Sequence, residues 1–239
     1  VAYKNIRLKK KMLAYFATNG NSTIAELSKE FNISIPKINE SITELIEEKL
    51  VKDYGKSTAG IGRKPNAYGL EANSAFFIGV QVGNDNLSIT MINMKKEIVA
   101  SKEDIPFLLE NNEKSLNIIC VAIKEFIAKQ NIKKEKILSI GINLSGRINY
   151  STGYSYSYFN FYEDPLSKYF EQEIGINTFL ENDTKALSYA EFNSGIIKNE
   201  KDVLFINIDT GIGLGILINR NVYYGKSGCS GEFGHIPIF

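Results

Sequence analysis

Apolar residues recur at helical spacing near the start of the chain. Between Asn5 and Gly20 they share one face of a helix, and Gly20 is a typical helix end. The apolar residues on this face are Ile6, Leu8, Met12, Leu13 and Phe16. The pattern predicts an amphipathic helix that packs this face into a small core.

Two further helical patterns follow the first. Thr23 stands three residues before Glu26, which is the spacing of a capping box. The apolar residues of this second helix are Ile24, Leu27 and Phe31. The third helix has Ser34 as its N-cap and Pro36 in its first turn, where the missing N–H costs nothing. Its apolar stripe consists of Ile35, Ile38, Ile42, Leu45 and Ile46.

The third helix is the candidate reader of DNA. Only the short link "NIS" separates it from the second helix, which is the spacing of a helix-turn-helix. Recognition helices present their first turns to base edges in the major groove. Glu40 in this region would accept from a cytosine amine or avoid the phosphates. The residues expected to contact DNA from this helix are Ser34, Pro36, Lys37, Asn39 and Ser41.

Residues 50–70 predict a β-wing. Strand-like pieces near residues 50–54 and 66–70 flank a Gly-rich tip. The cations of the wing, which we expect to hold phosphates or enter the minor groove, are Lys56, Arg63 and Lys64. Helix spacing and wing together favour DNA binding. The alternative is a small helical domain that contacts other proteins.

Charge is unevenly distributed along the 239 residues, although the net charge is only +1. Residues 1–70 contain 12 Lys and Arg against 7 Asp and Glu, and residues 71–239 contain 16 against 20. This asymmetry predicts a small basic module joined to a larger, mildly acidic domain. A basic module meets polyanions through counterion release, although an ordinary basic surface would look similar.

The remaining composition indicates a globular protein of the cytoplasm. A hydrophobic fraction of 44% can build a core. The chain has neither an apolar run of about eighteen residues nor a signal-peptide pattern. Cys120 and Cys229 give no CxxC and no disulfide framework, which fits a reducing compartment.

From residue 74 onward strands alternate with helices, which predicts an α/β layered fold. Three strands of a meander come first, in "AFFIGVQVG", "LSITMIN" and "KKEIVASKED". Helices are then expected in residues 112–131, 164–175 and 184–195, and strands in residues 137–146, 177–183 and 202–225. We place a winged helix-turn-helix domain at 1–72 and the α/β domain at 73–239, with lobes at 73–190 and 191–239.

Four motifs give the chain a specific resemblance to a known family. "DTGIGLGILINRNVYYGKSGCSGEFGH" resembles the signature of the ROK family, named for repressors, open reading frames and kinases. "GINLSGRINYSTG" resembles its Pro-Gly segment, with Ser145 where Pro is usual, and "FLENDTKALSYAE" resembles its Asn-Asp strand end. "GRKPNAYGL" resembles the join between winged helix and ROK domain in NagC/XylR-type regulators. The resemblance implies an actin-like (ribonuclease H-like) sugar-kinase-type domain.

That resemblance also implies a sugar site. The carboxylate of Glu232 can accept from two vicinal hydroxyls, and Gly146 permits close backbone approach. The alternatives are that "NDTKA" merely caps a helix and that His235 is a hydrogen-bonded core residue. The implied sugar contacts are Gly146, Asn160, Asn182, Asp183, Glu232 and His235.

In many family members the histidine of this segment is also a zinc ligand, together with three cysteines downstream. No such cysteines follow His235, and Cys229 lies upstream, so one ligand of a four-ligand site is visible. We therefore expect a fragment that ends before those cysteines and before the helices completing the second lobe. Zinc is expected only if those cysteines exist.

The first Gly turn argues against phosphoryl transfer. In ROK kinases an Asp-x-Gly-Gly-Thr-type loop helps to place the metal–nucleotide, but here Gln81 stands at the Asp position and Asp85 would repel a triphosphate. Asp183 would be a general base only in a kinase. We therefore expect no catalytic residue and poor nucleotide binding.

The favoured interpretation is a sugar-responsive transcriptional regulator, a repressor, that binds operator DNA as a dimer or tetramer. The first alternative is a ROK-type kinase that phosphorylates a hexose with ATP. The second is an interaction protein whose winged helix no longer contacts DNA. The sequence leaves open which monosaccharide or sugar phosphate is the effector, and whether it releases DNA or promotes binding.

Overall fold

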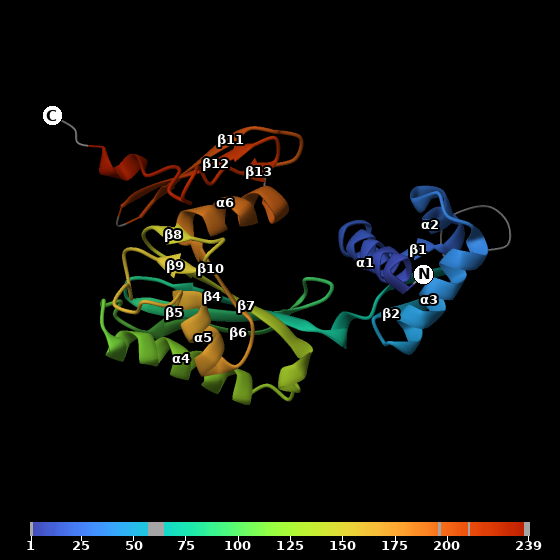
Figure 1. Cartoon of the computed structure of the whole chain (residues 1–239), viewed down its shortest axis with the longest axis horizontal. Helices are drawn as coiled ribbons and strands as arrows, with labels where there is room; N and C mark the ends of the chain where they lie inside the picture. The colour runs from blue at the N-terminus through green and yellow to red at the C-terminus, as the bar shows by residue number, and fades with distance from the viewer. Residues whose placement is uncertain (1, 57–64, 196, 210, 237–239) are drawn as a thin grey trace. The chain divides into compact units, whose positions relative to one another are not determined.

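The computed structural model describes residues 2–56, 65–195, 197–209 and 211–236 (Figure 1). It contains two compact units, Val1–Phe76 with Ile92–Val99, and Phe77–Met91 with Ala100–Phe239. The first unit thus includes the turn of a later hairpin. No helix within the described ranges combines the length and apolar character needed to cross a membrane.

The first unit is a winged helix. Its strands form one antiparallel sheet in the order β1-β3-β2, with Val51 opposite Leu70. The three predicted helices and both strands of the wing are confirmed, whereas β1 was not predicted. The elements are α1 (Ala2–Asn19), β1 (Ser22–Thr23), α2 (Ile24–Phe31), α3 (Ile35–Glu47), β2 (Val51–Lys56) and β3 (Asn66–Leu70).

The ends of α2 and α3 are closed by local hydrogen bonds. The predicted capping box is confirmed, because Thr23 Oγ1 accepts from the N–H of Glu26 at 3.3 Å and the Glu26 carboxylate accepts from the N–H of Thr23 at 2.7 Å. Asn32 ends α2 in the left-handed conformation, with φ of 52°. Ser34 occupies the N-cap position of α3, but its side chain makes no capping hydrogen bond.

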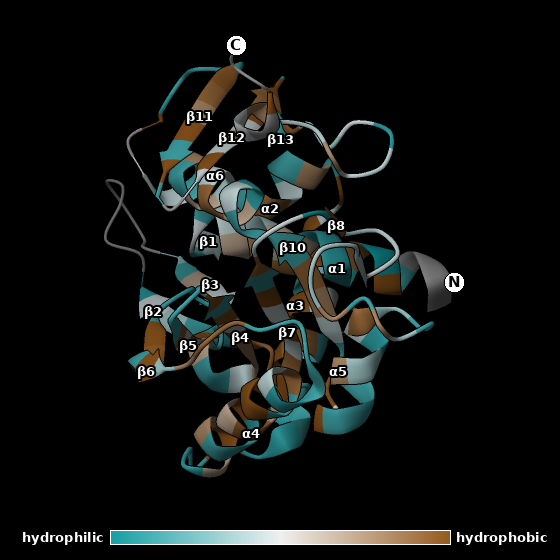
Figure 2. Ribbon diagram, turned by 90° about the vertical axis from the view of Figure 1, so that its left-hand side faces the viewer, coloured by the Kyte–Doolittle hydropathy of each residue, from teal (hydrophilic) through white to brown (hydrophobic). Residues whose placement is uncertain are grey.

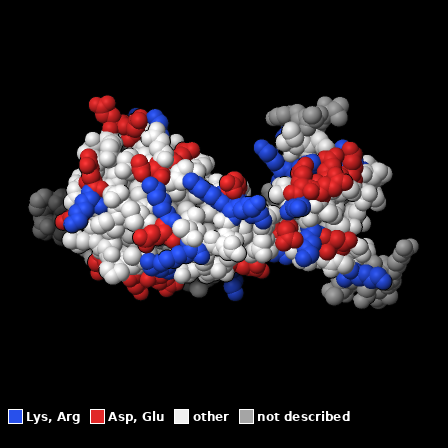
Figure 3. Space-filling model, turned by 90° about the horizontal axis from the view of Figure 1, so that it is seen from below, with Lys and Arg blue, Asp and Glu red and all other residues white. Residues whose placement is uncertain are grey.

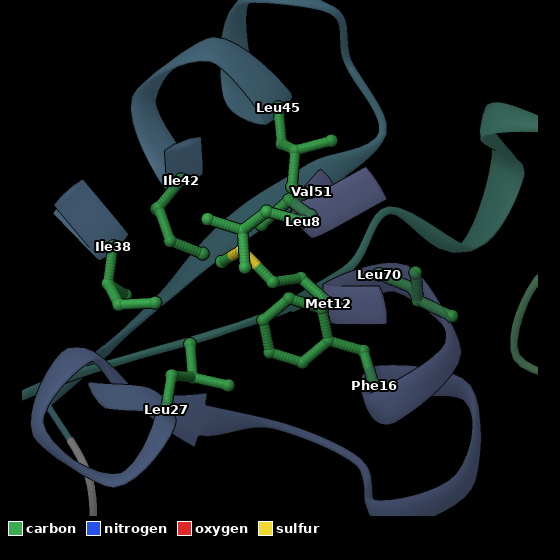
Figure 4. Close-up of a cluster of buried hydrophobic side chains, with 9 residues drawn as sticks. All are labelled: Leu8, Met12, Phe16, Leu27, Ile38, Ile42, Leu45, Val51 and Leu70. Atoms are coloured by element: carbon green, nitrogen blue, oxygen red, sulfur yellow. The ribbon is translucent and has the colours of Figure 1, made fainter. Parts of the chain in front are cut away.

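The core of the winged helix is formed by apolar side chains that point toward one another (Figure 4). Three residues expected in the apolar stripes are instead exposed: Ile6 by 53%, Ile35 by 56% and Ile46 by 37%. On α3 the buried face follows positions 38, 42 and 45, and residues 35 and 46 fall at its margin. The core residues are Leu8, Met12, Phe16, Leu27, Ile38, Ile42, Leu45, Val51 and Leu70.

A five-stranded sheet in the order β10-β7-β4-β5-β6 is the framework of the larger unit. Its strands β10 and β7 run parallel, with Asn182 opposite Leu144. The consecutive neighbours β4, β5 and β6 confirm the predicted meander. The strands are β4 (Phe76–Val82), β5 (Asn86–Asn93), β6 (Ile98–Pro106), β7 (Ile137–Leu144) and β10 (Thr178–Asn182).

Two amphipathic helices, α4 (Glu113–Ala128) and α5 (Leu166–Ile174), lie side by side on one face of this sheet (Figure 1). The buried side of α4 includes Leu116, Ile119 and Ile123. Both helices alternate between hydrophilic and hydrophobic colour along their turns in Figure 2. The sheet and these helices form the α/β layers that the alternating pattern predicted.

A second, antiparallel sheet packs against α6 (Asp183–Ser194). It consists of β11 (Val203–Ile208), β12 (Ile212–Ile218) and β13 (Asn221–Val222) in that order. Alternate residues of β11 stay exposed, and the strand is brown in Figure 2. A short two-stranded ribbon, β8 (Ile148–Asn149) with β9 (Tyr154–Ser155), was not predicted.

Candidate functional site

A polar cavity of about 550 Å³ opens in the larger unit where several strand ends meet. The ends of the parallel strands β7 and β10 provide its floor, together with the first turn of α6. The turn between β11 and β12 and the segment before the last 3-10 helix (Phe233–His235) complete the lining. The lining residues are 145–146, 157–158, 182–185, 211–214 and 230–232, with Asn84, Asn207 and Asp209.

Three hydrogen bonds within the protein hold the carboxylate of Asp183 in this cavity. Its Oδ2 accepts a hydrogen bond from the Ser145 hydroxyl at 2.6 Å. Its Oδ1 accepts from the N–H of Thr184 at 2.6 Å and from the Asn182 amide at 3.0 Å. An ionised carboxylate offers about four acceptor sites, so about one remains for a ligand hydroxyl. The side chain is therefore held in one orientation without being saturated.

The side-chain amide of Asn182 makes its hydrogen bonds within the protein. Its Oδ1 accepts from the N–H of Lys185 at 3.0 Å, which makes it the N-cap residue of α6. Its Nδ2 donates both to the Gly146 carbonyl and to Asp183, each at 3.0 Å. Both amide protons are therefore in use. The helix-cap alternative holds for this residue, which positions the carboxylate rather than offering a ligand a free donor.

Gly146 follows the end of β7 with φ of +90°, a conformation that strongly favours glycine. A Cβ added there would collide with the side chain of Ser157. The close approach lets Ser157 Oγ accept from the N–H of Arg147 at 3.0 Å, which ties the loop after β9 to the end of β7. The structure thus explains this glycine by its contact with Ser157, and a close approach to a sugar stays a prediction.

The other three predicted sugar contacts lie in different surroundings. Glu232 lines the cavity beside Gly231. Asn160 is exposed and is not among the lining residues, because its carboxamide bonds Asn111 and the carbonyl of Tyr156. The backbone of His235 lies in the last 3-10 helix, but its side chain lies outside the described part of the structure.

Several lining residues were not predicted as site residues. Ser145 was noted only as a departure from the usual Pro, yet its hydroxyl binds Asp183. Ser157 and Tyr158 reach the cavity from the loop after β9, and Lys185 lines it although only 3% of its surface is exposed. A strand-end position could have signalled Ser145, whereas the others depend on loop folding.

The glycines of the second Gly turn serve the packing of the second sheet. A Cβ on Gly213 would collide with the Thr184 side chain at the start of α6, and one on Gly215 would collide with Ser188. Gly231 and Gly234 lie against backbone carbonyls of β12. Gly211 has open space around its Cβ position. Most of this Gly-rich pattern is thus explained without a nucleotide.

A second cavity of about 470 Å³ lies elsewhere in the larger unit and includes Gln81, the residue expected at the nucleotide loop. Gln81 does not line the polar cavity. Glu181 borders the second cavity, where burial raises the pKa of its carboxyl against the opposing effect of a 2.7 Å hydrogen bond from the Tyr224 hydroxyl. The rings of Tyr150 and Tyr224 stack 3.8 Å apart beside it.

The predicted DNA-reading surface is largely accessible. Ser34, Pro36 and Asn39 are exposed, and Lys37 forms an exposed ion pair of 2.8 Å with Glu40. Ser41 is a correction, because its side chain is fully buried and cannot reach DNA. It follows Ile38 by one turn and precedes Ile42, so it lies on the core side of α3.

Of the three cations predicted to contact DNA from the wing, Lys56 lies among the described residues. Lys56 is exposed at the end of β2, whereas Arg63 and Lys64 lie outside the described residues. On the face drawn in Figure 3, Lys and Arg are interspersed with Asp and Glu. Charge on that face is thus mixed.

The described residues do not fit a zinc site. Within the described ranges, no group of three His, Cys, Asp or Glu side chains could hold a metal ion. Cys229 instead donates its thiol to the Ser227 carbonyl at 3.6 Å. Zinc binding therefore has no support from these residues, and no role is assigned to it.

Comparisons with known proteins agree with this architecture. The ROK family model matches residues 77–239, which include the whole polar cavity, and a winged helix-turn-helix DNA-binding model matches residues 7–52. The chain belongs to the ROK family. It is 27% identical over 232 residues to the xylose repressor of Bacillus spizizenii, covering 96% of this chain and 60% of that protein.

Two solved ROK proteins share the fold. A ROK family transcriptional regulator, a homolog of the E. coli MLC protein, matches with a TM-score of 0.76 and 22% identity over 99% of this chain and 60% of its own. The ROK glucokinase of Streptomyces griseus, solved with glucose and AMPPNP, matches with a TM-score of 0.58 and 23% identity over 69% of this chain and 51% of its own. These likenesses confirm the predicted fold class, a winged helix followed by an actin-like ROK domain.

Proposed function

We propose that this chain is the DNA-binding and sugar-binding part of a sugar-responsive transcriptional repressor. One observation supports this proposal above others: a winged helix with an accessible α3 and a ROK domain with a polar cavity occur in one chain. The xylose repressor matched above aligns with 96% of this chain, so the similarity extends over both units. Since the chain spans 60% of that protein's length, the function of the whole protein is part of the proposal.

The cavity has the chemistry that a sugar requires. Asp183 keeps about one acceptor site after its three internal hydrogen bonds, and a hydrogen bond from a hydroxyl to a carboxylate is a strong, charge-assisted one. Glu232 adds a second carboxylate to the lining, and Tyr158 adds an aromatic ring. The internal bonds to Ser145 and Asn182 orient Asp183 before a ligand arrives, which lowers the entropic cost of binding.

DNA recognition is assigned to α3 and the wing. Asn39 is exposed in the second turn of α3 and can bond an adenine edge in the major groove. Lys37 and Lys56 are placed to contact phosphates, which fix register rather than sequence. The sugar then acts by binding the DNA-competent and DNA-incompetent states with different affinities. A dimer or tetramer that matches a two-fold operator remains a prediction.

We propose a regulatory rather than a catalytic role for the ROK domain. Phosphoryl transfer depends on positioning the phosphates and neutralising their charge. Here Gln81 borders the other cavity, and two glycines of the second Gly turn, Gly213 and Gly215, are explained by packing against α6. A hexose kinase is the alternative, and ADP formation from ATP in the presence of a hexose would support it instead.

The decisive experiment is fluorescence anisotropy with a labelled duplex from the protein's own upstream region. The full protein is titrated at two salt concentrations, with and without a panel of monosaccharides and their phosphates. We expect tight binding that weakens steeply with salt and changes with one sugar. Asn39→Ala should weaken specific binding by about 1–3 kcal/mol, because a good base contact is worth that much.

Glu47→Gln is the matched control, since this exposed side chain lies on the same helix near its C-terminal end. It should leave sequence discrimination unchanged. Equal effects of Asn39→Ala and Glu47→Gln would remove α3 as the reader. Failure to bind any duplex at either salt concentration would favour the interaction-protein alternative.

A further inference from the structure

The polar cavity contains more negative than positive charge. Among its described lining residues the carboxylates are Asp183, Asp209 and Glu232, and Lys185 supplies the one ammonium group. The Lys185 side chain is almost entirely buried in the first turn of α6. A ligand in this cavity therefore meets an acidic lining.

Lys185 also acts on a carboxylate outside the polar cavity. Its ammonium group acts on Glu181, where it opposes the larger effect of burial on the pKa of that carboxyl. Glu181 borders the second cavity and not the polar one. The three carboxylates of the described polar lining therefore outnumber its one ammonium group.

The start of α6 is also closed to a bound anion. A helix N-terminus attracts phosphate through its free N–H groups. Here the N–H of Thr184 donates to the Asp183 carboxylate at 2.6 Å, and the N–H of Lys185 donates to the Asn182 amide oxygen at 3.0 Å. The protein's own carboxylate stands where a phosphate would have to bind.

Arg147 is another cation near this cavity that could attract an anion. It lines an adjoining cavity of about 480 Å³ that shares Gly146, Ser157 and Glu232 with the polar one. Its side chain is exposed, so solvent and salt screen its charge. Glu232 lines both cavities.

We infer that the effector is an uncharged sugar rather than a sugar phosphate, an inference that rests on the proposed sugar-binding function. A phosphate monoester brings a charge of about −1.5 to −2 at neutral pH into a lining of three carboxylates. Like charges in a partly desolvated site disfavour each other strongly. Hydroxyl groups, in contrast, donate to carboxylates, and Asp183 keeps about one acceptor site for such a donor.

The test compares matched pairs by isothermal titration calorimetry on the full protein. The probes are D-glucose, D-xylose and N-acetyl-D-glucosamine, each with its own phosphate monoester. For the sugar that binds, we expect the phosphate to bind about tenfold more weakly or worse at low salt. That ratio should shrink as salt is added, because salt screens repulsion. Tighter binding of a phosphate would overturn the inference and leave the proposed function intact.

Two variants sharpen the result. Asp183→Asn removes one negative charge, so it should weaken binding of the uncharged sugar and bring the two affinities closer together. An unchanged ratio in this variant would count against the repulsion argument. Arg147→Ala should change the affinity for neither the sugar nor its phosphate by more than about twofold. If this variant loses binding of a sugar phosphate, Arg147 binds the phosphate from the adjoining cavity, and the inference is overturned. If no sugar of either kind binds while DNA binding persists, the sugar-binding proposal and this inference both fail.

Discussion

The winged helix and the polar cavity place their functional side chains by different means. On α3 the exposed Asn39 and the buried Ile38 and Ile42 are set by the period of a single helix. In the cavity, Ser145 and Asp183 are 38 residues apart and meet because β7 and β10 run side by side. The first surface thus depends on local pattern and a small core, and the second on sheet topology.

The two sites are therefore held in place by different interactions. The DNA-reading surface depends on apolar packing beneath α3, since its own polar groups make few internal bonds. The cavity depends on close backbone approaches and a chain of hydrogen bonds through Asn182, Asp183 and Ser145. Substitutions that disturb one kind of support should leave the other site working.

The largest effect is expected in the core of the winged helix. Leu45 is fully buried in the core cluster of the winged helix, so Leu45→Ala should lower the free energy of unfolding of this unit by about 2–5 kcal/mol. DNA binding should be lost at moderate temperature while sugar affinity is retained. Denaturant titration followed by circular dichroism, with calorimetric sugar binding, measures both.

Ile46→Ala is the matched control, because Ile46 is the next residue on α3 and is 37% exposed. It should change stability by no more than about 0.5 kcal/mol. Equal losses in the two variants would show that the buried stripe of α3 was misassigned. Loss of sugar binding together with DNA binding in Leu45→Ala would break the contrast between the two units.

A smaller effect is expected where β12 meets α6. Gly213→Ala places a Cβ into the Thr184 side chain, and overpacking of this kind costs about 1–3 kcal/mol. Gly211→Ala is the control, since open space surrounds its Cβ position. Thermal unfolding should separate the two variants, because only Gly213→Ala disturbs the Thr184 side chain. Equal melting temperatures would contradict the packing role of this glycine.

The fold was predictable from pattern to the extent that elements were long or capped. The capping box at Thr23 and the strand runs of the larger sheet were read correctly because each depends on neighbours in sequence. Ser41 was misplaced because a polar residue beside the apolar stripe was assumed to face solvent, although its helical position faces the core. The two-residue strands β1, β8 and β9 are too short to leave a periodic pattern.

The cavity was predictable only in part. Asp183 and Gly146 stand at strand ends, and strand ends are where ligand sites form in α/β sheets. Asn160 and Ser157 lie in a loop without period, so no pattern could show that Ser157 faces the cavity and Asn160 does not. Asn182 both caps α6 and donates to Gly146 and Asp183, and only the folded structure brings these three partners together.

A further test compares the two kinds of hydrogen bond that Asn182 makes, the cap of α6 and the bonds donated by its amide. Asn182→Ala removes the cap of α6 and the bond to the Gly146 carbonyl, so it should cost about 0.5–2 kcal/mol of stability. Asn182→Asp can still accept from the N–H of Lys185 and should recover part of that loss. Urea unfolding curves of both variants measure this recovery. No recovery with Asp would indicate that the two bonds donated by the amide, to Gly146 and to Asp183, contribute more than the cap.

The smallest effect is expected at the capping box, and it depends on pH. The N–H of Thr23 is the main cause that lowers the pKa of the Glu26 carboxyl, followed by the hydroxyls of Thr23 and Ser22. Because the folded-state pKa lies below the unfolded one, the stabilisation is fully present above the unfolded pKa. It is lost as pH falls through the folded pKa. Glu26→Gln should therefore destabilise the winged helix by no more than about 1 kcal/mol at neutral pH.

The two proteins should approach equal stability as the solution is acidified, because protonated Glu26 and Gln are then both uncharged. Urea titrations of wild type and Glu26→Gln between neutral pH and the acid range measure this convergence. Glu30→Gln is the control, since Glu30 is exposed on the same helix outside the capping box. A stability difference for Glu26→Gln that stays constant down to acid pH would show that the box acts through geometry alone. A growing difference would reverse the sign of the linkage and contradict the lowered pKa.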